Sequence, residues 1–280
     1  MTTSHPMPPT FQNLLLTGAA GTLGRVLARP LATLASQGGG TLRLSDLGSA
    51  LPTVPLPPGA HAMPCDLANA DQVQALLQGV DAIVHLGGIS VEGPIAPIMA
   101  ANILGLHHLY EAARRQGVRR IVFASSNHVI GCYPQSQLLG TDERPRPDGN
   151  YGLSKLFGEG IASLYWDRHG IETVCLRIGT ATPTPPDARG LATWVSLPDL
   201  VRLVTASLNA PEVGFLVAYG VSANTRAFWR CDEAWARLGY QPQDNAEAYA
   251  DQVQHLLQPE GPMRDLQGGA FLGRGPYDPS

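Results

Sequence analysis

The sequence predicts an α/β protein: a doubly wound parallel sheet with a small C-terminal lobe. Short apolar runs alternate with longer stretches of helical spacing along most of the chain, which is the pattern of parallel strands covered by helices on both faces. The 280 residues, of which 44% are hydrophobic, suffice for one sizeable core. In addition, a glycine-rich segment follows the first apolar run directly, as expected for a turn between a strand and a helix.

Six apolar runs make up the expected sheet: 14–17, 41–46, 60–65, 82–86, 120–125 and 172–178. Helical spacing fills the intervals between them, and the expected helices run from Gly24 to about 36 and over 71–78, 95–116 and 151–169. Each strand is therefore followed by a turn, loop or helix that returns the chain to the same edge of the sheet.

After residue 178 the pattern changes. A Pro-rich loop at 181–190 precedes a helix near 198–209, a strand near 215–219 and a Gly/Pro-rich tail over 259–280. We therefore expect a disordered leader at 1–10, the core at 11–178, and a small lobe with the tail at 179–280 that is interleaved with the core.

Composition excludes several classes of protein. A net charge of −4 argues against a nucleic-acid or anionic-membrane surface, which needs clustered Lys and Arg. No apolar run is long enough to span a bilayer, and the N-terminus lacks a secretory pattern, so a cytoplasmic location is expected. The four cysteines stand far apart, without the close pairs of a structural zinc site, so no metal is expected.

Gly18, Gly21 and Gly24 form a GxxGxxG pattern between the first expected strand and its helix. Such glycines allow a tight turn and a close approach of the backbone to a pyrophosphate at the helix N-terminus, as in a Rossmann-type dinucleotide site. Asp46 ends the second expected strand, where a carboxylate would accept hydrogen bonds from the ribose hydroxyls. Its charge disfavours a 2′-phosphate, so the expected cofactor is NAD and not NADP.

Two further strand ends face the same crevice, because ligands of open α/β sheets bind at the carboxyl ends of the strands. Asp66 follows the third strand and could contact the adenine amine, although a helix N-cap is the alternative role. Gly87 and Gly88 follow the fourth strand, where glycine lets the backbone pass close to a ligand.

Tyr151 and Lys155 stand four residues apart at the start of an expected helix, and therefore on one face of it. Lys155 is the single lysine, beside 18 arginines. An ammonium close to a phenol favours the phenolate, so the pair is expected to lower the pKa of Tyr151 and let it accept a proton from a hydroxyl. Ser126, at the end of the fifth strand, could orient the same oxygen.

Arg189 is a further candidate, because it stands in an otherwise nearly uncharged Pro-rich loop after the sixth strand. A planar guanidinium binds a carboxylate through two parallel hydrogen bonds. The alternative is a solvated loop arginine.

Together, GxxGxxG, Ser126 at a strand end and Tyr-x-x-x-Lys resemble the extended short-chain dehydrogenase/reductase family, within the NAD-dependent epimerase/dehydratase superfamily, over residues 12–270. Segments at 84–94, 120–134, 146–159, 176–194, 244–249 and 266–271 resemble, more narrowly, the uronate dehydrogenase family. That resemblance implies NAD-dependent oxidation of the anomeric carbon of D-galacturonate or D-glucuronate to an aldarolactone. It also implies a small-molecule hexuronic acid as the partner, and a homo-oligomer.

The resemblance assigns the catalytic base to Tyr151, its activating lysine to Lys155 and a hydroxyl partner to Ser126. The substrate contacts that it implies are Ser90, Ser126, Asn127, His128, Tyr151, Thr180 and Arg189, with Thr180 replacing the serine common in the family. The expected cofactor-binding residues are Gly18, Gly21, Thr22, Leu23, Gly24, Asp46, Leu47, Asp66, Leu67, Leu86, Gly87, Gly88, Ser90, Tyr151 and Lys155.

Two other functions remain open from the sequence. One is a nucleotide-sugar epimerase or dehydratase that keeps its NAD bound through turnover. The other is a dinucleotide-sensing protein without chemistry, against which the retained Tyr151 and Lys155 pair counts.

Overall fold

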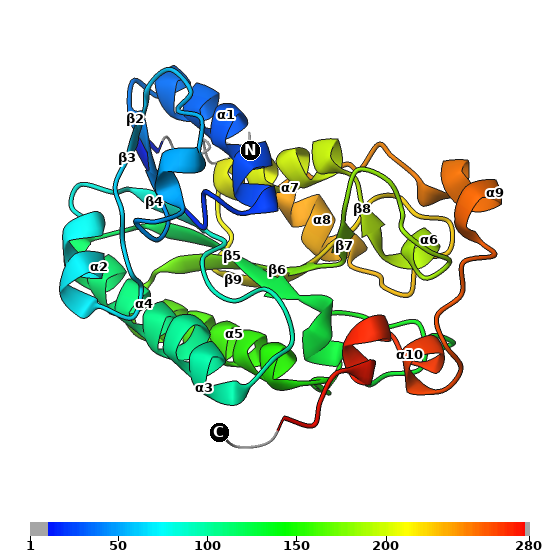
Figure 1. The fold of residues 1–280 in the computed structure, drawn as a ribbon. Helices are drawn as coiled ribbons and strands as arrows, with labels where there is room; N and C mark the ends of the chain where they lie inside the picture. Colours follow the sequence, from blue (N-terminus) through cyan, green and yellow to red (C-terminus); the bar gives the residue numbers. More distant parts are fainter. Residues whose placement is uncertain (1–10, 278–280) are drawn as a thin grey trace.

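A computed structural model describes residues 11–277 (Figure 1); the leader expected at 1–10 lies outside them. In this part of the chain seven strands form one parallel sheet in the order β3-β2-β1-β4-β5-β6-β9. The strands are β1 (Asn13–Thr17), β2 (Thr41–Ser45), β3 (Ala60–Ala62), β4 (Ala82–His85), β5 (Arg120–Ser126), β6 (Glu172–Ile178) and β9 (Phe215–Gly220). The fold class predicted from the sequence is confirmed.

The α-helices of the described residues are α1 (Thr22–Gln37), α2 (Ala70–Leu76), α3 (Ile95–Ile98), α4 (Gly105–Gln116), α5 (Asn150–His169), α6 (Gly190–Thr193), α7 (Leu197–Asn209), α8 (Asp232–Leu238), α9 (Ala250–Val253) and α10 (Pro262–Asp265). Shorter turns of other helical types are η1 (Leu51–Thr53), η2 (Met99–Leu104), η3 (Asn127–Ile130), η4 (Ala246–Tyr249) and η5 (Gly269–Gly273).

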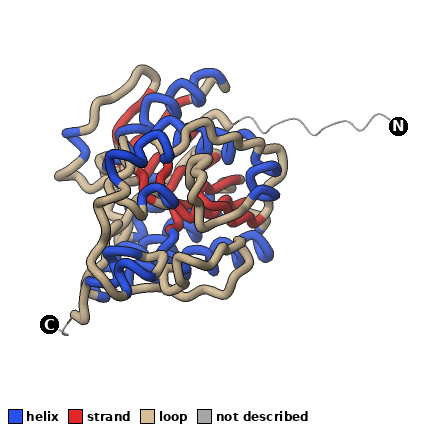
Figure 2. The backbone as a smooth tube through the Cα atoms, turned by 90° about the vertical axis from the view of Figure 1, so that its right-hand side faces the viewer, coloured by secondary structure: helices blue, strands red, loops and turns tan. Residues whose placement is uncertain are grey.

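Helices cover both faces of the sheet (Figure 2). Helices α1, α7 and α8 lie on one side, and α2, α4 and α5 lie on the other (Figure 1). Alternate side chains of a strand enter the two layers: Leu14 and Leu16 pack into one buried cluster, and Leu15 packs into the other. This alternation explains why the three central residues of β1, Leu14 to Leu16, are all apolar, since both faces of a doubly covered strand are buried.

Strands β1 and β4 are neighbours, with Thr17 paired to His85 at their carboxyl ends. The chain winds outward from β1 in one direction through β2 and β3, and from β4 in the other direction through β5, β6 and β9. The carboxyl ends of β1 and β4 therefore flank the point where the winding reverses, which is where such sheets leave a crevice for a ligand.

The expected elements match the observed ones to within about two residues at each end, except for one strand and one helix. The regular part of the strand expected at 60–65 ends at Ala62, although the amides of Met63 and Cys65 still donate to the carbonyls of Leu44 and Asp46 beside it. The helix expected at 95–116 contains a π-helical segment, η2, in which the side chain of Asn102 bonds the backbone of Ile89. The strand near 215 joins the main sheet as β9, beside β6.

Strand β9 and helix α7 both come from residues 179–280, which the sequence assigns to an interleaved lobe. The same region contributes a two-stranded sheet of β7 (Thr180–Ala181) and β8 (Trp194–Val195). Helices α6, α9 and α10 lie beyond one end of the main sheet (Figure 1). The division of the chain at residue 178 stays a prediction.

Candidate active site

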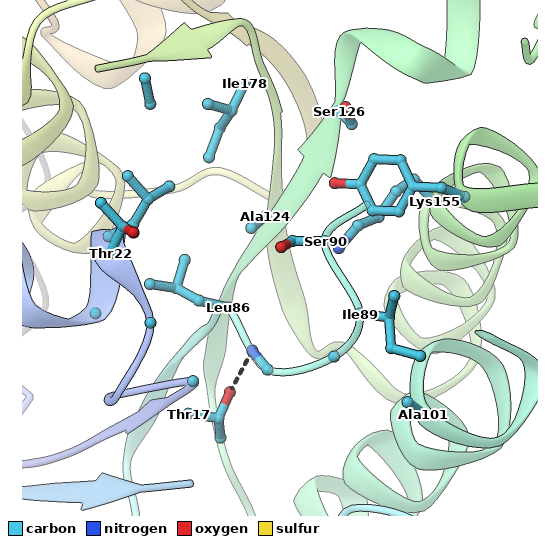
Figure 3. Close-up of a pocket in the computed structure, with 18 of the residues that line it drawn as sticks. Thr17, Thr22, Leu86, Ile89, Ser90, Ala101, Ala124, Ser126, Lys155 and Ile178 are labelled. Carbon is cyan, nitrogen blue, oxygen red and sulfur yellow. Dashed lines mark hydrogen bonds between the residues drawn. The ribbon is translucent and has the colours of Figure 1, made fainter. Parts of the chain in front are cut away.

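A cavity of about 980 Å³ opens at the carboxyl ends of the strands. Segments from the β1–α1 turn, the ends of β2, β4, β5 and β6, the start of α5 and the C-terminal η5 meet around it. Its lining includes all the residues expected to bind cofactor or substrate: Gly18, Gly21, Thr22, Leu23, Gly24, Asp46, Leu47, Asp66, Leu67, Leu86, Gly87, Gly88, Ser90, Ser126, Asn127, His128, Tyr151, Lys155, Thr180 and Arg189. In Figure 3, Ser90, Ser126 and Lys155 lie together on one side, across the cavity from Thr22.

The turn between β1 and α1 requires glycine for close packing. Gly18 has a φ of +70°, and a Cβ there would lie 2.8 Å from the carbonyl carbon of Leu86. A Cβ on Gly24 would lie 2.2 Å from the carbonyl oxygen of Gly18. Helix α1 begins at Thr22 with Gly21 as its N-cap, and no side chain caps it. Its first-turn amides therefore face the cavity and can bind an anion.

Asp46 stands directly after β2, with its carboxylate fixed beside this turn. One carboxylate oxygen accepts from the amide of Ala20 at 2.9 Å, and the other accepts from the amide of Leu47 at 2.8 Å. This geometry leaves remaining lone pairs for a hydroxyl donor.

Asp66 is not the N-cap of α2, so that alternative is wrong. Asn69 caps the helix instead, because its side chain accepts from the amides of Asp71 and Gln72. Asp66 accepts locally from the amide of Ala68 at 2.9 Å and remains in the cavity wall.

Thr17 joins the ends of β1 and β4 beneath the cavity. Its hydroxyl accepts from the amide of Gly87 at 3.1 Å (Figure 3). The same hydroxyl lies 2.8 Å from Nδ1 of His85. Burial, followed by the charge of Lys155, lowers the pKa of His85 to about 3, so its ring is neutral. These bonds fix the loop containing Gly87 at the floor of the cavity.

Tyr151 and Lys155 lie in the first turns of α5, and both are buried. The Nζ atom of Lys155 lies 5.5 Å from the centre of the Tyr151 ring and 5.0 Å from that of Phe123. Burial raises the pKa of Tyr151 to about 12, against the lowering effect of its hydrogen bond with Ser126. The expectation that this pKa is lowered is therefore not met in the protein alone, because desolvation of the phenol is the largest influence and the charge of Asp148 adds to it.

Burial also lowers the pKa of Lys155, to about 8. The amine therefore stays protonated at neutral pH and places a positive charge beside Tyr151. As predicted from the sequence, Tyr151 and Lys155 lie four residues apart in one helix and so share a face of it.

Glu92 was missed by the sequence reasoning, although it fixes the start of α5. Its carboxylate accepts from the amide of Asn150 at 3.1 Å and from that of Tyr151 at 2.8 Å. Farther along the helix, Ser154 accepts a hydrogen bond from the Asn102 amide at 2.9 Å. No local motif indicated that Glu92 caps a helix so distant in the chain.

Arg189 is half-buried in the cavity wall, beside Asn127. Its Nε and Nη2 donate to the carbonyl of Gln267 at 2.8 and 2.5 Å. The side-chain amide of Asn127 is oriented so that its oxygen accepts from Nη2 of Arg189 at 3.0 Å. Its nitrogen then donates to the carbonyl of Ile178. Nη1 lies 3.4 Å from the Thr180 hydroxyl.

The anchoring of Arg189 changes what it can offer a ligand. Both hydrogens of Nη2 are engaged, so the expected pair of parallel bonds to a carboxylate is not set up in this structure. Nη1 is the nitrogen left to donate. Burial lowers the pKa of Arg189 to about 10, so the guanidinium stays charged at neutral pH.

His128 completes the wall near Tyr151. Its Nδ1 lies 2.7 Å from a carboxylate oxygen of Asp148, and its ring stacks on Phe271 with centres 3.9 Å apart. Asp148 and Phe271 were both missed as site residues. The only sequence signal for Phe271 was its place in the 266–271 segment of the family resemblance.

Among residues 11–277, no cluster of three or more His, Cys, Asp or Glu side chains could hold a metal ion. Cys65, Cys132, Cys175 and Cys231 are free thiols. Over the same residues, no helix has the length and apolar character to cross a membrane.

Comparison with known proteins gives a family and near relatives. Residues 14–186 match the NAD dependent epimerase/dehydratase family. The chain is 46% identical to the uronate dehydrogenase of Pseudomonas syringae pv. tomato, over 99% of both chains. It is 48% identical to the uronate dehydrogenase of Agrobacterium fabrum, over 94% of this chain and 97% of that one.

Solved structures agree with these relatives. A mutant uronate dehydrogenase of Agrobacterium tumefaciens complexed with NAD matches with a TM-score of 0.88 at 46% identity, over 96% of this chain and 99% of that one. A glucuronic acid dehydrogenase from Chromohalobacter salexigens matches with a TM-score of 0.88 at 44% identity, over 95% and 98% of the two chains.

Proposed function

The chain belongs to the NAD dependent epimerase/dehydratase family, and we propose that its NAD-dependent oxidation of uronates takes place at the anomeric C1 hydroxyl of D-galacturonate or D-glucuronate. Since C1 already bears the ring oxygen, removal of a hydride and a proton turns the hemiacetal into an ester. The product is an aldarolactone, and no second oxidation is needed.

The residues present fit NAD. Gly18 and Gly24 leave no room for a Cβ in the turn, the first-turn amides of α1 are uncapped, and Asp46 is oriented beside them. The glycine turn and the free amides suit a pyrophosphate, and the Asp46 carboxylate suits the hydroxyls of a ribose. When bound, the oxidised cofactor supplies the acceptor for the C1 hydride and brings a positive charge.

Tyr151 is the proposed acceptor of the proton from the C1 hydroxyl. It accepts only as the phenolate, and its pKa of about 12 in the protein alone has to fall. The charge of bound NAD would add to that of the protonated Lys155 and so favour the phenolate. As the O–H bond of the C1 hydroxyl breaks, its proton passes to Tyr151, and the oxygen stays on C1 as the lactone carbonyl.

Ser126 is the proposed hydrogen-bond partner of the same oxygen. Its hydroxyl oxygen accepts from the amide of His128 at 3.2 Å. The hydroxyl proton is therefore free to point toward Tyr151 or toward the oxygen at C1. A donor held there stabilises charge on the oxygen as the proton leaves.

The observation that carries the assignment to an acid sugar is Arg189, a permanent positive charge that shares one cavity with Tyr151 and Lys155. Its Nη1 can bind the uronate carboxylate through one charge-assisted hydrogen bond. Asn127, His128, Thr180 and Ser90 remain the proposed contacts to the sugar hydroxyls.

The test is to mix purified protein with NAD and, separately, galacturonate, glucuronate, galactose and a UDP-sugar, and to follow the absorbance of reduced nicotinamide. A rise that is much faster with the two uronates than with galactose or the UDP-sugar supports the proposal. A rise with none of them would favour an epimerase or dehydratase, which forms no net reduced nicotinamide. A cytoplasmic location and a homo-oligomeric state stay predictions from the sequence.

A further inference from the structure

His128 is held on three sides at the edge of the cavity. Nδ1 meets Asp148 at 2.7 Å, one ring face stacks on Phe271 at an interplanar angle of 10°, and the backbone amide donates to Ser126. With Nδ1 engaged, Nε2 is the polar atom that the ring can offer to the cavity.

Asp148 occupies a site built for its carboxylate. Its side chain has no exposed surface. A Cβ added at Gly131 or at Gly268 would lie 1.9 Å from its Oδ2, and one at Gly152 would lie 3.1 Å from its Oδ1. Three separate segments, one of them from the C-terminal region, therefore each present a glycine to this one carboxylate.

The hydrogen bonds of Asp148 point to His128 alone. Oδ1 is buried and has no hydrogen-bond partner among the described residues, while Oδ2 pairs with Nδ1 of His128. A buried carboxylate with an unsatisfied oxygen destabilises the fold, so a role other than stability accounts for it better. The backbone joins the same two residues, since the amide of Asp148 donates to the carbonyl of His128 at 3.3 Å.

We propose that Asp148 is a positioning residue for uronate oxidation, which holds the Nδ1–H of His128 and so presents Nε2 to the cavity as a hydrogen-bond acceptor for a sugar hydroxyl. A carboxylate only accepts, so the proton of the shared bond belongs to Nδ1. In the neutral ring, Nε2 then carries the lone pair. The inference rests on the proposed function, in which His128 contacts the substrate.

Phe271 supports the same arrangement from the C-terminal segment. Its ring stacks on His128 and meets Tyr151 edge-on with centres 5.8 Å apart. Rotation of the imidazole about its Cβ–Cγ bond is therefore opposed by the stacking on Phe271 and by the bond to Asp148. Its orientation is set before the substrate arrives.

The test is a double-mutant cycle of Asp148→Asn and His128→Ala, read as kcat and KM for galacturonate. Asparagine keeps the size of the side chain, but its NH2 group donates and reverses the proton preference at Nδ1. We expect Asp148→Asn to lower kcat/KM about tenfold, mainly through KM, and to have no further effect in the His128→Ala protein.

An equal loss from Asp148→Asn in both backgrounds would overturn the inference, because Asp148 would then act elsewhere, for example through its charge on Tyr151. Asp81→Asn is the matched control. Asp81 binds the amides of Gln12 and Asn13 outside the cavity, so this variant should leave kcat/KM unchanged.

A second measurement needs no stable Asp148 variant. In wild-type protein labelled with 15N-histidine, the signal of His128, assigned by its absence in His128→Ala, should show a neutral ring protonated at Nδ1. A ring that carries a proton on Nε2, alone or together with one on Nδ1, would overturn the inference, because Nε2 could then not accept. This arm does not depend on activity, so it separates the inference from the proposed function, which fails only if wild-type protein does not oxidise uronates.

Discussion

Glu92 and Tyr151 are joined by a hydrogen bond across 59 residues of sequence, in which the Glu92 carboxylate accepts from the backbone amide of Tyr151 at 2.8 Å. The same carboxylate bonds the amide of Asn150. Gly149 precedes the helix and offers no side-chain cap. Glu92 therefore does for α5 what an N-cap side chain normally does. It ties the helix of Tyr151 and Lys155 to the loop after β4, which also contains Ser90.

Replacing Glu92 by alanine should remove this cap. We expect the free energy of unfolding to fall by about 2 kcal/mol, and kcat to fall because the first turn of α5 frays at Tyr151. Denaturant unfolding and steady-state kinetics measure the two effects. The control is Glu260→Ala, whose side chain is 92% exposed and should change neither. Equal behaviour of the two variants would refute the capping role.

Tyr151→Phe should reduce turnover of galacturonate by about 100- to 10,000-fold, since the proton acceptor is lost while the ring remains. Calorimetric titration should show an unchanged affinity for NAD. Tyr249→Phe is a suitable control, because Tyr249 packs on Trp194 outside the cavity. Nearly full activity of Tyr151→Phe would disprove the assigned role.

Asp46→Arg should shift cofactor preference toward NADP. The variant removes the acceptor for the ribose hydroxyls and places a cation where a 2′-phosphate would lie. The ratio of kcat/KM for NAD to that for NADP is the quantity to compare between the two proteins. An unchanged ratio would show that Asp46 does not contact the ribose.

Lys155→Met should remove a pH dependence of stability. In wild-type protein burial lowers the pKa of Lys155 from 10.5 to about 8. Below pH 8 both states carry the proton, and the folded state bears the full cost of the buried charge. Between pH 8 and pH 10.5 only the unfolded state keeps the proton. This contribution to the free energy of unfolding therefore rises with pH, by about 3 kcal/mol in total.

The Met variant lacks this rise and is expected to be the more stable protein below pH 8. Chemical unfolding at pH 7, 8.5 and 10 measures the difference between the two proteins, which cancels the titration of the other buried groups. The advantage of the variant should shrink across that series. If the difference in the free energy of unfolding between the two proteins stayed constant across the series, the pKa of Lys155 would not lie between pH 7 and pH 10.

The parts of the site that the sequence predicted are those fixed by local spacing. Gly18, Gly21 and Gly24 follow a strand and open a helix, so their pattern alone defines the turn. Tyr151 and Lys155 share a helix face for the same reason. Ser126 was found because carboxyl ends of neighbouring parallel strands meet at one edge.

The remaining features depend on contacts between distant segments. Glu92, Asp148 and Phe271 reach the site from a loop, a turn and the C-terminal segment, and none stands in a motif that indicates its partner. The pKa of Tyr151 was predicted in the wrong direction because spacing reports the nearby charge but not the depth of burial.

The most direct test of the account compares kcat/KM for galacturonate and for galactose in wild-type protein and in Arg189→Ala. Arg189 also anchors the carbonyl of Gln267, so any structural damage should affect both sugars alike. The account predicts a loss on the order of 100-fold with galacturonate and little change with galactose. Equal losses with the two sugars would contradict recognition of the carboxylate by Arg189.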